Sequence, residues 1–330
     1  MLLYVDDISI LYLEDATKAA IEVKARLSEN YKITNLGPAH QFLGIEIHPE
    51  EYGTSTGTGT TISLGQKVFI TTILKEFNMQ NAHGAAAPMD ANVKLDLAED
   101  RGEKELKDIK GYQAIVGSLM YVALPTQPDI SFTVAALCRY NSRPFTSHLT
   151  AAKRVVQYLK STADFRLHFN STGSNDLLTG YTDSDWANDS ADRKCQGGHV
   201  FLLTIGAVSW QSRKQDLIAM STLEAKYIAC SEGSHDAKWL LQLHRDIHGK
   251  DASPLPINCD NHGALSHIST GIIKARTKHI DVCYHNSRNL HARKISDYSY
   301  VHTNEDVADT LTKALMTDQL EIFTKAMGLW

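Results

Sequence analysis

Two adjacent carboxylates near the start of the chain are the first residues whose types and spacing could do chemistry. Asp6 and Asp7 separate two apolar runs, Leu2 to Val5 and Ile8 to Leu13, so the spacing predicts a tight β-hairpin with both acids at its turn. Poor alternation of apolar and polar residues predicts strands that are buried on both faces. A divalent cation, best magnesium, would offset the repulsion between buried carboxylates. The alternative is an ordinary exposed turn, because Asp is a common turn residue.

Four further acids are spread over the second half of the chain, and each has an ordinary structural explanation. Asp183 could end a strand, Asp260 could cap a helix, and Asp309 could lie on a solvated helix face. Glu224 stands three residues after a serine, which is the spacing of a capping box. Taken one by one, these explanations are favoured over a functional role.

Composition limits the classes of protein that fit. With 330 residues, 43% hydrophobic and 22% charged, the chain is globular in composition and long enough for two or three compact units. The apolar runs are shorter than the ~20 residues that a membrane span needs, so no membrane partner is expected. The five cysteines are scattered without a Cys-x-x-Cys pair, which predicts reduced thiols in an intracellular, cytoplasmic protein.

The hydrophobic periodicity predicts an α/β fold of the mixed α+β kind. The first part is predicted to hold the hairpin, a helix over 17–30, strands at 41–48 and 61–64 joined by a Gly/Thr/Ser-rich loop over 52–60, and helices over 66–77, 112–124, 128–140 and 150–160. After a boundary near 170–175, we expect strands at 177–181, 199–204, 207–211, 256–259 and 295–301, and helices over 221–248, after 260, near 278–290 and from 305. Hairpin strands followed by alternating helix and strand imply a mixed sheet with helices on its faces.

Several short segments of the first 170 residues resemble, in their order, the reverse transcriptases of copia-type retrotransposons. The segments are LLYVDDI at 2–8, FLGIEI at 42–47, YQAIVGSLMY at 112–121 and PDISF at 128–132. The resemblance implies that residues 1–90 are the C-terminal part of a reverse transcriptase and that 91–170 form a helical thumb and connection region. It also implies that Asp6 and Asp7 are metal-binding acids of a polymerase.

The same resemblance implies that parts of a polymerase are missing. A reverse transcriptase needs a third carboxylate, the fingers and most of the palm before its hairpin, and here Asp6 is almost the first residue. We therefore expect the missing N-terminal polymerase half of a polyprotein to be a partner. We also expect residues 1–170 alone not to polymerise.

The last part of the chain resembles the ribonuclease H domain of the same elements. The segments are YTDSDWA at 181–187, STLEAKY at 221–227, CDN at 259–261, RTKHID at 276–281 and ADTLTK at 308–313. The resemblance implies a ribonuclease H-like mixed sheet over 175–320, in which Asp183, Glu224, Asp260 and Asp309 gather at one edge. Such acids would hold two magnesium ions, with manganese as the second candidate, for hydrolysis of RNA. The implied substrate is an RNA–DNA hybrid made of retroelement RNA and cDNA, within a virus-like particle if the element is active.

Three basic residues are candidate substrate contacts. Arg276, Lys278 and His279 could hold the backbone of the hybrid beside an acidic metal site. A charge cluster at the start of a helix, with no partner, is the equal alternative. The net charge of −5 does not by itself indicate a polyanionic partner, because phosphate binding normally leaves a basic footprint.

One residue departs from the family pattern. Copia-type elements usually show Glu-Ala-Glu-Tyr where this chain has Glu224, Ala225, Lys226 and Tyr227, and the register of general ribonucleases H points to position 226 as the metal-binding glutamate. A lysine there removes a ligand and adds a repelling cation. We expect a weakened or inactive nuclease, unless Glu224 reaches the site instead. The alternative function is a decayed element that retains only its fold or nucleic-acid binding.

Overall fold

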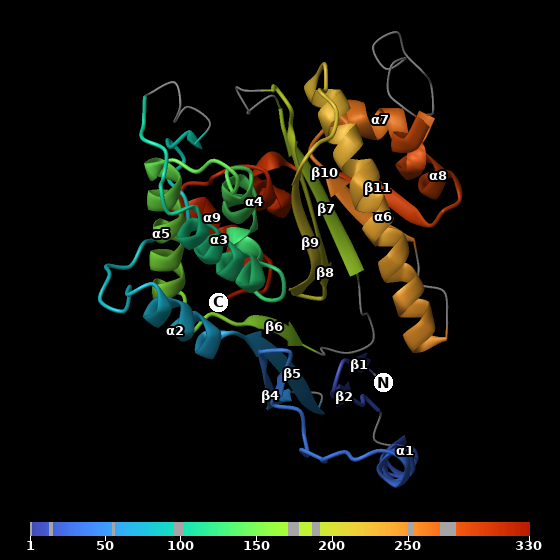
Figure 1. The fold of residues 1–330 in the computed structure, drawn as a ribbon. Coiled ribbons are helices and arrows are strands. Elements are labelled where there is room, and N and C mark those ends of the chain that lie inside the picture. Colours follow the sequence, from blue (N-terminus) through green and yellow to red (C-terminus); the bar gives the residue numbers. More distant parts are fainter. Residues whose placement is uncertain are drawn as a thin grey trace.

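The computed structural model describes residues 2–12, 16–54, 57–95, 102–170, 178–186, 192–249, 254–270 and 282–330. Within these ranges the strands form one two-stranded, one four-stranded and one five-stranded sheet, with helices around them (Figure 1). The predicted mixed α/β class is confirmed. No helix in the described ranges is both long and apolar enough to cross a membrane.

The five-stranded sheet is the centre of the second half of the chain. Its strand order is β11-β10-β7-β8-β9, in which β7, β8 and β9 form an antiparallel meander and β10 and β11 are added in parallel. The strands are β7 (Leu178–Asp185), β8 (Gln196–Leu203), β9 (Gly206–Lys214), β10 (Leu255–Cys259) and β11 (Ser296–Tyr300). This is the mixed sheet that the alternation of strand and helix predicted.

Helix α6 (Thr222–His248) covers one face of this sheet. The Ser221 side chain caps its first turn by accepting a hydrogen bond from the Glu224 backbone N–H, and Gly249 ends it in a left-handed conformation (φ 67°). Phe201 of β8 packs with Ala237 and Leu240 of α6. Helix α7 (His262–Thr270), the 3₁₀ helix η5 (Val282–His285) and helix α8 (Asn286–Ala292) follow on the same side of the molecule (Figure 1).

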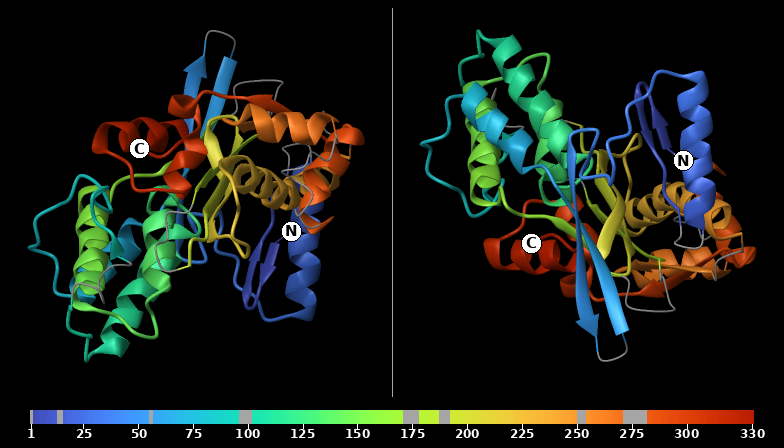
Figure 2. Two further views of the ribbon diagram at one scale, coloured as in Figure 1. Left: turned by 90° about the horizontal axis from the view of Figure 1, so that it is seen from above. Right: turned by 90° about the horizontal axis from the view of Figure 1, so that it is seen from below.

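The other face of the sheet packs against a group of helices from the middle and the end of the chain. Val200 and Leu202, which flank Phe201 on β8, belong to the core of that group, as strand alternation requires. Figure 2 shows the green helices and the yellow α6 on opposite sides of the strands. The helices are α2 (Lys67–Glu76), α3 (Ile109–Ala123), η3 (Pro128–Ile130), α4 (Ser131–Cys138), α5 (Thr146–Ser161) and α9 (Thr317–Ala326).

One hydrophobic core therefore runs from the helix group into the five-stranded sheet. Leu119 of α3, Val155 of α5, Val200 of β8 and Phe323 of α9 are members of a single cluster of buried residues. The Trp210 Nε1–H of β9 also donates to the Ala123 carbonyl of α3, at 3.0 Å. The boundary expected near residues 170–175 stays a prediction, and the core continues across it.

The four-stranded sheet differs from the sequence prediction in three places. Its strands are β3 (Gln41–Phe42), β4 (Ile45–Thr54), β5 (Gly57–Gly65) and β6 (Leu167–Asn170), in that order. The predicted strand 41–48 is broken at Leu43 and Gly44, which both have positive φ. The prediction of a loop over 52–60 was wrong, because β4 and β5 pair as far as Thr54 and Gly57. The stretch is rich in threonine, which favours strands because its Cβ is branched. Strand β6 was not predicted.

The N-terminal hairpin is exposed. Strands β1 (Leu2–Tyr4) and β2 (Asp7–Ser9) pair with Tyr4 opposite Asp7, so the turn consists of Val5 and Asp6 rather than of the two acids. The prediction of strands buried on both faces was wrong: Leu3 is 66% exposed, because the described elements leave this ribbon uncovered. The predicted helix that follows is confirmed as α1 (Thr17–Asn30).

Candidate metal centre

Acidic side chains from three distant parts of the chain meet at one edge of the five-stranded sheet. Asp183 lies near the end of β7, Asp260 directly follows β10, and Asp306 precedes the 3₁₀ helix η7 (Val307–Leu311). One carboxylate oxygen from each of these three acids lies within 4.8 Å of the others. Because β7 and β10 are neighbouring parallel strands, their carboxyl ends meet at the same edge.

Segment 307–312 is held against the sheet over Asp183. Asp183 is 1% exposed and accepts a hydrogen bond from the Thr312 hydroxyl. Gly198 lies opposite Asp183 on β8, and a Cβ at Gly198 would stand 2.7 Å from Leu311 Cβ and 2.9 Å from Thr312 Cγ2. The missing side chain of Gly198 is therefore what lets η7 approach the acid.

Asp309 lies on η7 rather than on the α-helix predicted from residue 305. The predicted helix is divided into η6 (Thr303–Glu305), η7 and α9. The Asp309 carboxylate is buried and stands 2.8 Å from Lys313 Nζ. Burial and the nearby charge of Asp183 raise the pKa of Asp309 to about 7, against the opposing effect of Lys313. Asp309 is thus poised between its two protonation states near neutral pH.

Asp306 is an acid of this site that the sequence reasoning missed. It is fully buried, and one oxygen caps η7 by accepting the Ala308 backbone N–H at 3.1 Å. The second oxygen, Oδ2, has no hydrogen-bond partner among the described residues. Burial, followed by the charge of Asp183, raises the pKa of Asp306 well above its ordinary value. Its spacing of three residues from Asp309 was the only signal in the sequence, and it is equally typical of a helix cap.

Lys226 of α6 points into the middle of the acids. Its Nζ lies 2.7 Å from Asp183 Oδ1 and forms a second ion pair with Asp260 Oδ1, with 14% of the side chain exposed. Burial opposes the charge of Lys226, but the two carboxylates outweigh it and raise the pKa of the ammonium. Burial likewise opposes the charge of Asp183, yet Lys226 brings the pKa of Asp183 below its ordinary value. The three groups are a charged cluster in which an ammonium lies between two acids.

These residues fit a divalent cation in all but one respect. Carboxylate oxygens are the ligands that magnesium prefers, and Asp306, whose Oδ2 has no hydrogen-bond partner among the described residues, contributes one oxygen to the same cluster. Lys226 is the exception, because its ammonium occupies the position between Asp183 and Asp260 where a cation would bind both.

Glu224 is not a member of this acid group. Its backbone N–H donates to Ser221 Oγ at 3.3 Å, and its Oε2 accepts the Met220 backbone N–H at 2.8 Å, so both ends take part in the cap of α6. Residue 226, two positions later, is the one that faces the sheet edge. The role of Glu224 as a metal ligand stays a prediction, and its printed hydrogen bonds show a structural role in the helix cap.

The other predicted site residues lie elsewhere. Asp6 and Asp7 are exposed on the N-terminal hairpin and are not part of the acid group at the sheet edge. Arg276, Lys278 and His279 fall outside the described residues. Of the nine residues named from the sequence, the structure brings together Asp183, Asp260 and Asp309.

Comparisons with known proteins place the chain in a family. The model of the reverse transcriptase (RNA-dependent DNA polymerase) family matches residues 1–91. Over its whole length the chain is 34% identical to the Pol polyprotein of transposon TNT 1-94 from Nicotiana tabacum, of which it spans 24%. A putative transposon Ty5-1 protein of Saccharomyces cerevisiae is 33% identical over 69% of this chain and 70% of that protein.

The chain thus spans about a quarter of the length of the Pol polyproteins that it matches. Among solved structures, the N-terminal RNase H domain of a Mycobacterium tuberculosis protein is similar with 16% identity and a TM-score of 0.32. That match covers 46% of this chain and 99% of the solved one.

Proposed function

The chain belongs to the copia-type retrotransposon Pol polyproteins, and we propose that its C-terminal part is a ribonuclease H that cleaves the RNA strand of RNA–DNA hybrids. The observation that carries this proposal is the convergence of Asp183, Asp260 and Asp306, with Asp309 beside them, at the end of two parallel strands. In the proposed division, residues 1–90 are the end of the reverse transcriptase, 91–170 the helical thumb and connection, and 175–320 the nuclease.

The acids would perform this reaction by holding cations against the scissile phosphate. When bound, magnesium or manganese would supply an activated water and stabilise the leaving oxygen of the RNA strand. Asp183 is suited to ligation because the Thr312 hydroxyl donates a hydrogen bond that fixes its carboxylate. Asp309, with a pKa of about 7, exchanges its proton easily for a cation.

Lys226 opposes this reaction in the sequence as it stands. Its ammonium is bound by the same oxygens that a cation would need, so a cation must displace a buried ion pair before it can bind. The Lys226 ammonium and a divalent cation between Asp183 and Asp260 would also repel each other, because both are positive. The proposal therefore includes weak or absent cleavage, relieved by substitution at position 226.

The test compares the full chain with Lys226→Glu on an RNA–DNA hybrid in magnesium. We expect cleavage near background for the parent and a gain of at least about a hundredfold for the variant. Loss of a residue that only hydrogen-bonds to a metal ligand already costs about 10–100-fold in metal affinity or activity, and position 226 would supply a ligand itself. Lys238→Glu is the matched control, since Lys238 is exposed on the same helix and should give no gain. Asp183→Asn added to Lys226→Glu should return cleavage to background. Full cleavage by the parent with no gain on substitution would contradict the proposal.

A hybrid-binding module without cleavage is the second candidate function. The single observation that favours it is the ammonium of Lys226 between Asp183 and Asp260, which neutralises the cluster without a metal. Measuring both hybrid binding and hybrid cleavage by the Lys226→Glu variant distinguishes the two functions. A Lys226→Glu variant that binds the hybrid and still does not cut it supports the second candidate.

The N-terminal part is proposed to complete a polymerase with a segment outside this chain. Asp6 and Asp7 would supply two carboxylates of its metal site, and the upstream half of the polyprotein would supply the third and cover the exposed hairpin. The substrates would be the element's RNA and cDNA, with Arg276, Lys278 and His279 among the backbone contacts. The proposed compartment is the cytoplasm, or the virus-like particle of an active element.

A further inference from the structure

Two threonine hydroxyls hold the acids near the ends of β7 and β10. The Thr303 hydroxyl donates to Asp260 Oδ2 at 2.8 Å, and the Thr312 hydroxyl donates to Asp183 Oδ2. The Thr312 hydroxyl also lies 3.3 Å from a backbone carbonyl, which is a longer contact than its bond to the carboxylate. Both threonines belong to one stretch of chain, because the first begins η6 and the second directly follows η7. We call residues 303–312 the donor segment.

The other oxygen of each of these two acids contacts the Lys226 ammonium. Lys226 Nζ lies 2.7 Å from Asp183 Oδ1 and is also bound to Asp260 Oδ1. In both carboxylates, Oδ2 is therefore bound to a hydroxyl and Oδ1 to the ammonium. Asp306 shows a related division, because its Oδ1 accepts a backbone N–H of the donor segment and its Oδ2 has no hydrogen-bond partner among the described residues. Each of the three acids that form the cluster thus has one oxygen bound by the donor segment.

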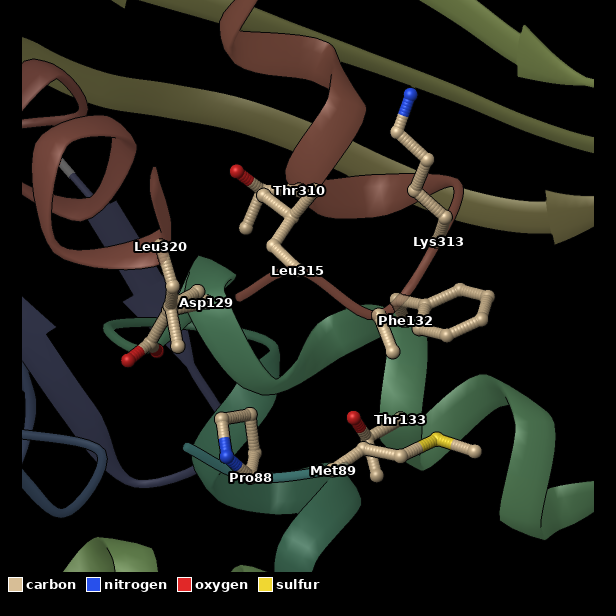
Figure 3. Close-up of a pocket in the computed structure, with 10 residues that line it drawn as sticks. Pro88, Met89, Asp129, Phe132, Thr133, Thr310, Lys313, Leu315 and Leu320 are labelled. Carbon is tan, nitrogen blue, oxygen red and sulfur yellow. The ribbon is translucent and has the colours of Figure 1, made fainter. Parts of the chain in front are cut away.

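The donor segment is closely packed on the side of the helix group. Leu311 of η7 belongs to the core that the helix group shares with the sheet. Thr310 and Phe132 of α4 line a hollow of only about 10 Å³ (Figure 3), which has room for about one water molecule. In that view the Lys313 amine extends away from the other labelled side chains, and it pairs with an acid of the site at 2.8 Å. Close packing of this kind fixes the hydroxyls relative to the acids.

The fixed orientation limits how many oxygens each acid can offer to a cation. In bidentate ligation both oxygens of a carboxylate face the metal, so Oδ2 would have to turn towards the position of the ammonium and leave its hydroxyl. Hydrogen bonds to charged groups are among the stronger ones, so this turn is unfavourable. Calcium takes about six to eight oxygen ligands and often binds carboxylates through both oxygens, whereas magnesium takes six ligands in an octahedron and keeps several waters. The arrangement therefore favours magnesium over calcium.

We propose that Thr303 and Thr312 are positioning residues that aim one oxygen of Asp260 and one of Asp183 at a common cation position, and that they thereby select magnesium against calcium. The selection rests on the proposed function, because the ammonium of Lys226 must be removed before a metal can bind. The orientation of the acids does not, since it is already present around the ammonium. Both threonines act through the acids that they orient.

The first arm of the test needs no metal. Thermal unfolding compares the full chain with Thr303→Val, Lys226→Gln and the variant with both substitutions. If Thr303 turns Asp260 towards the ammonium, the two single losses of melting temperature should sum to more than the loss in the double variant, by about 1–6 °C. Thr71→Val, at an exposed threonine of α2, takes the place of Thr303→Val in a control cycle whose losses should add. Additive losses in the Thr303 cycle would overturn the positioning role.

The second arm measures metal selectivity through binding rather than cleavage. Stabilisation against thermal unfolding is titrated with magnesium and with calcium for Lys226→Gln alone and for Lys226→Gln combined with Thr303→Val, Thr312→Val or Thr303→Ser. Each valine should strengthen calcium binding relative to magnesium by about tenfold, the factor for one hydrogen bond to a charged group. Serine keeps the hydroxyl and should keep the ratio, and Thr71→Val should have no effect. An unchanged ratio in both valine variants would overturn the selectivity.

The results also distinguish this inference from the proposed function. If the valines change the ratio and Lys226→Glu still does not cleave a hybrid, the positioning role stands and the nuclease fails by itself. If neither cation stabilises Lys226→Gln, the metal site, the nuclease and the selectivity fail together, and the coupling of Thr303 to Lys226 decides the positioning role. Thr312 is fully buried and Thr303 only half-buried, so Thr303→Val decides the selectivity if Thr312→Val does not unfold cooperatively.

Discussion

Replacement of Lys226 by glutamine should destabilise the fold in a way that magnesium reverses. In the parent, the ammonium neutralises two carboxylates whose side chains are 2% and 6% exposed, those of Asp183 and Asp260. Lys226→Gln leaves both acids buried without a cation. Loss of one partner from a buried ion pair costs about 3–5 kcal/mol. At about 2 °C per kcal/mol for a chain of this size, the melting temperature should fall by about 6–10 °C.

Magnesium should restore much of this loss, because the variant opens the position between the two acids to a cation. At a concentration one hundred times its dissociation constant, a ligand of the folded state adds about 2.7 kcal/mol. The assay is thermal unfolding of the parent, Lys226→Gln and the control Lys238→Gln, each with and without magnesium. Only Lys226→Gln should be stabilised by the metal. Equal melting temperatures, or equal stabilisation of all three proteins by magnesium, would refute the reasoning about the ammonium.

Three further outcomes are expected from other parts of the structure. Gly198→Ala should lower the free energy of unfolding by about 1–3 kcal/mol in thermal unfolding, because the new Cβ would stand 2.7 Å from Leu311 Cβ. Gly117→Ala is the control: its new Cβ meets nothing within 4 Å, so the substitution should be neutral or stabilising. Burial raises the pKa of Asp129 to about 6, so the folded state holds its proton more tightly than the unfolded state, and Asp129 should contribute about 3 kcal/mol to a loss of stability as pH rises from about 4 to about 6. Chemical denaturation across this pH range checks this: Asp129→Asn should make the decline smaller by about that amount, while the raised pKa values of Asp306 and Asp309 keep their own contribution to it. Finally, the chain alone should not extend a primer, since Asp6 and Asp7 are exposed and no third carboxylate joins them among the described residues; DNA synthesis that is lost in Asp6→Asn would show otherwise.

The sequence by itself determined most local structure and the residue types of the site. The capping box that begins with Ser221 and the glycine at 249 fixed both ends of α6, because caps depend on residues a few positions apart. Periodicity predicted a strand over 256–259 directly before Asp260 and a strand over 177–181, which ends two residues before Asp183, whereas β7 continues to Asp185. The resemblance to the family pattern marked position 226 as the unusual residue of the acid site. Where patterns were ambiguous, as in the threonine-rich stretch over 52–60, the expected loop proved to be paired strand.

Only the tertiary structure decided which of these groups meet. Lys226 is separated from Asp183 by 43 residues and Thr312 from Asp183 by 129, so their contacts depend on strand order and on the space left by Gly198. Asp306 could be recognised as a site residue only once η7 lay against β7 and β8, and the position of the Lys226 ammonium between two acids depends on the face that α6 turns to the sheet. Capping and periodicity act between near neighbours along the chain. The charge cluster, in contrast, exists because hydrophobic packing brings distant segments to one sheet edge, and the sequence carries no local mark of that encounter.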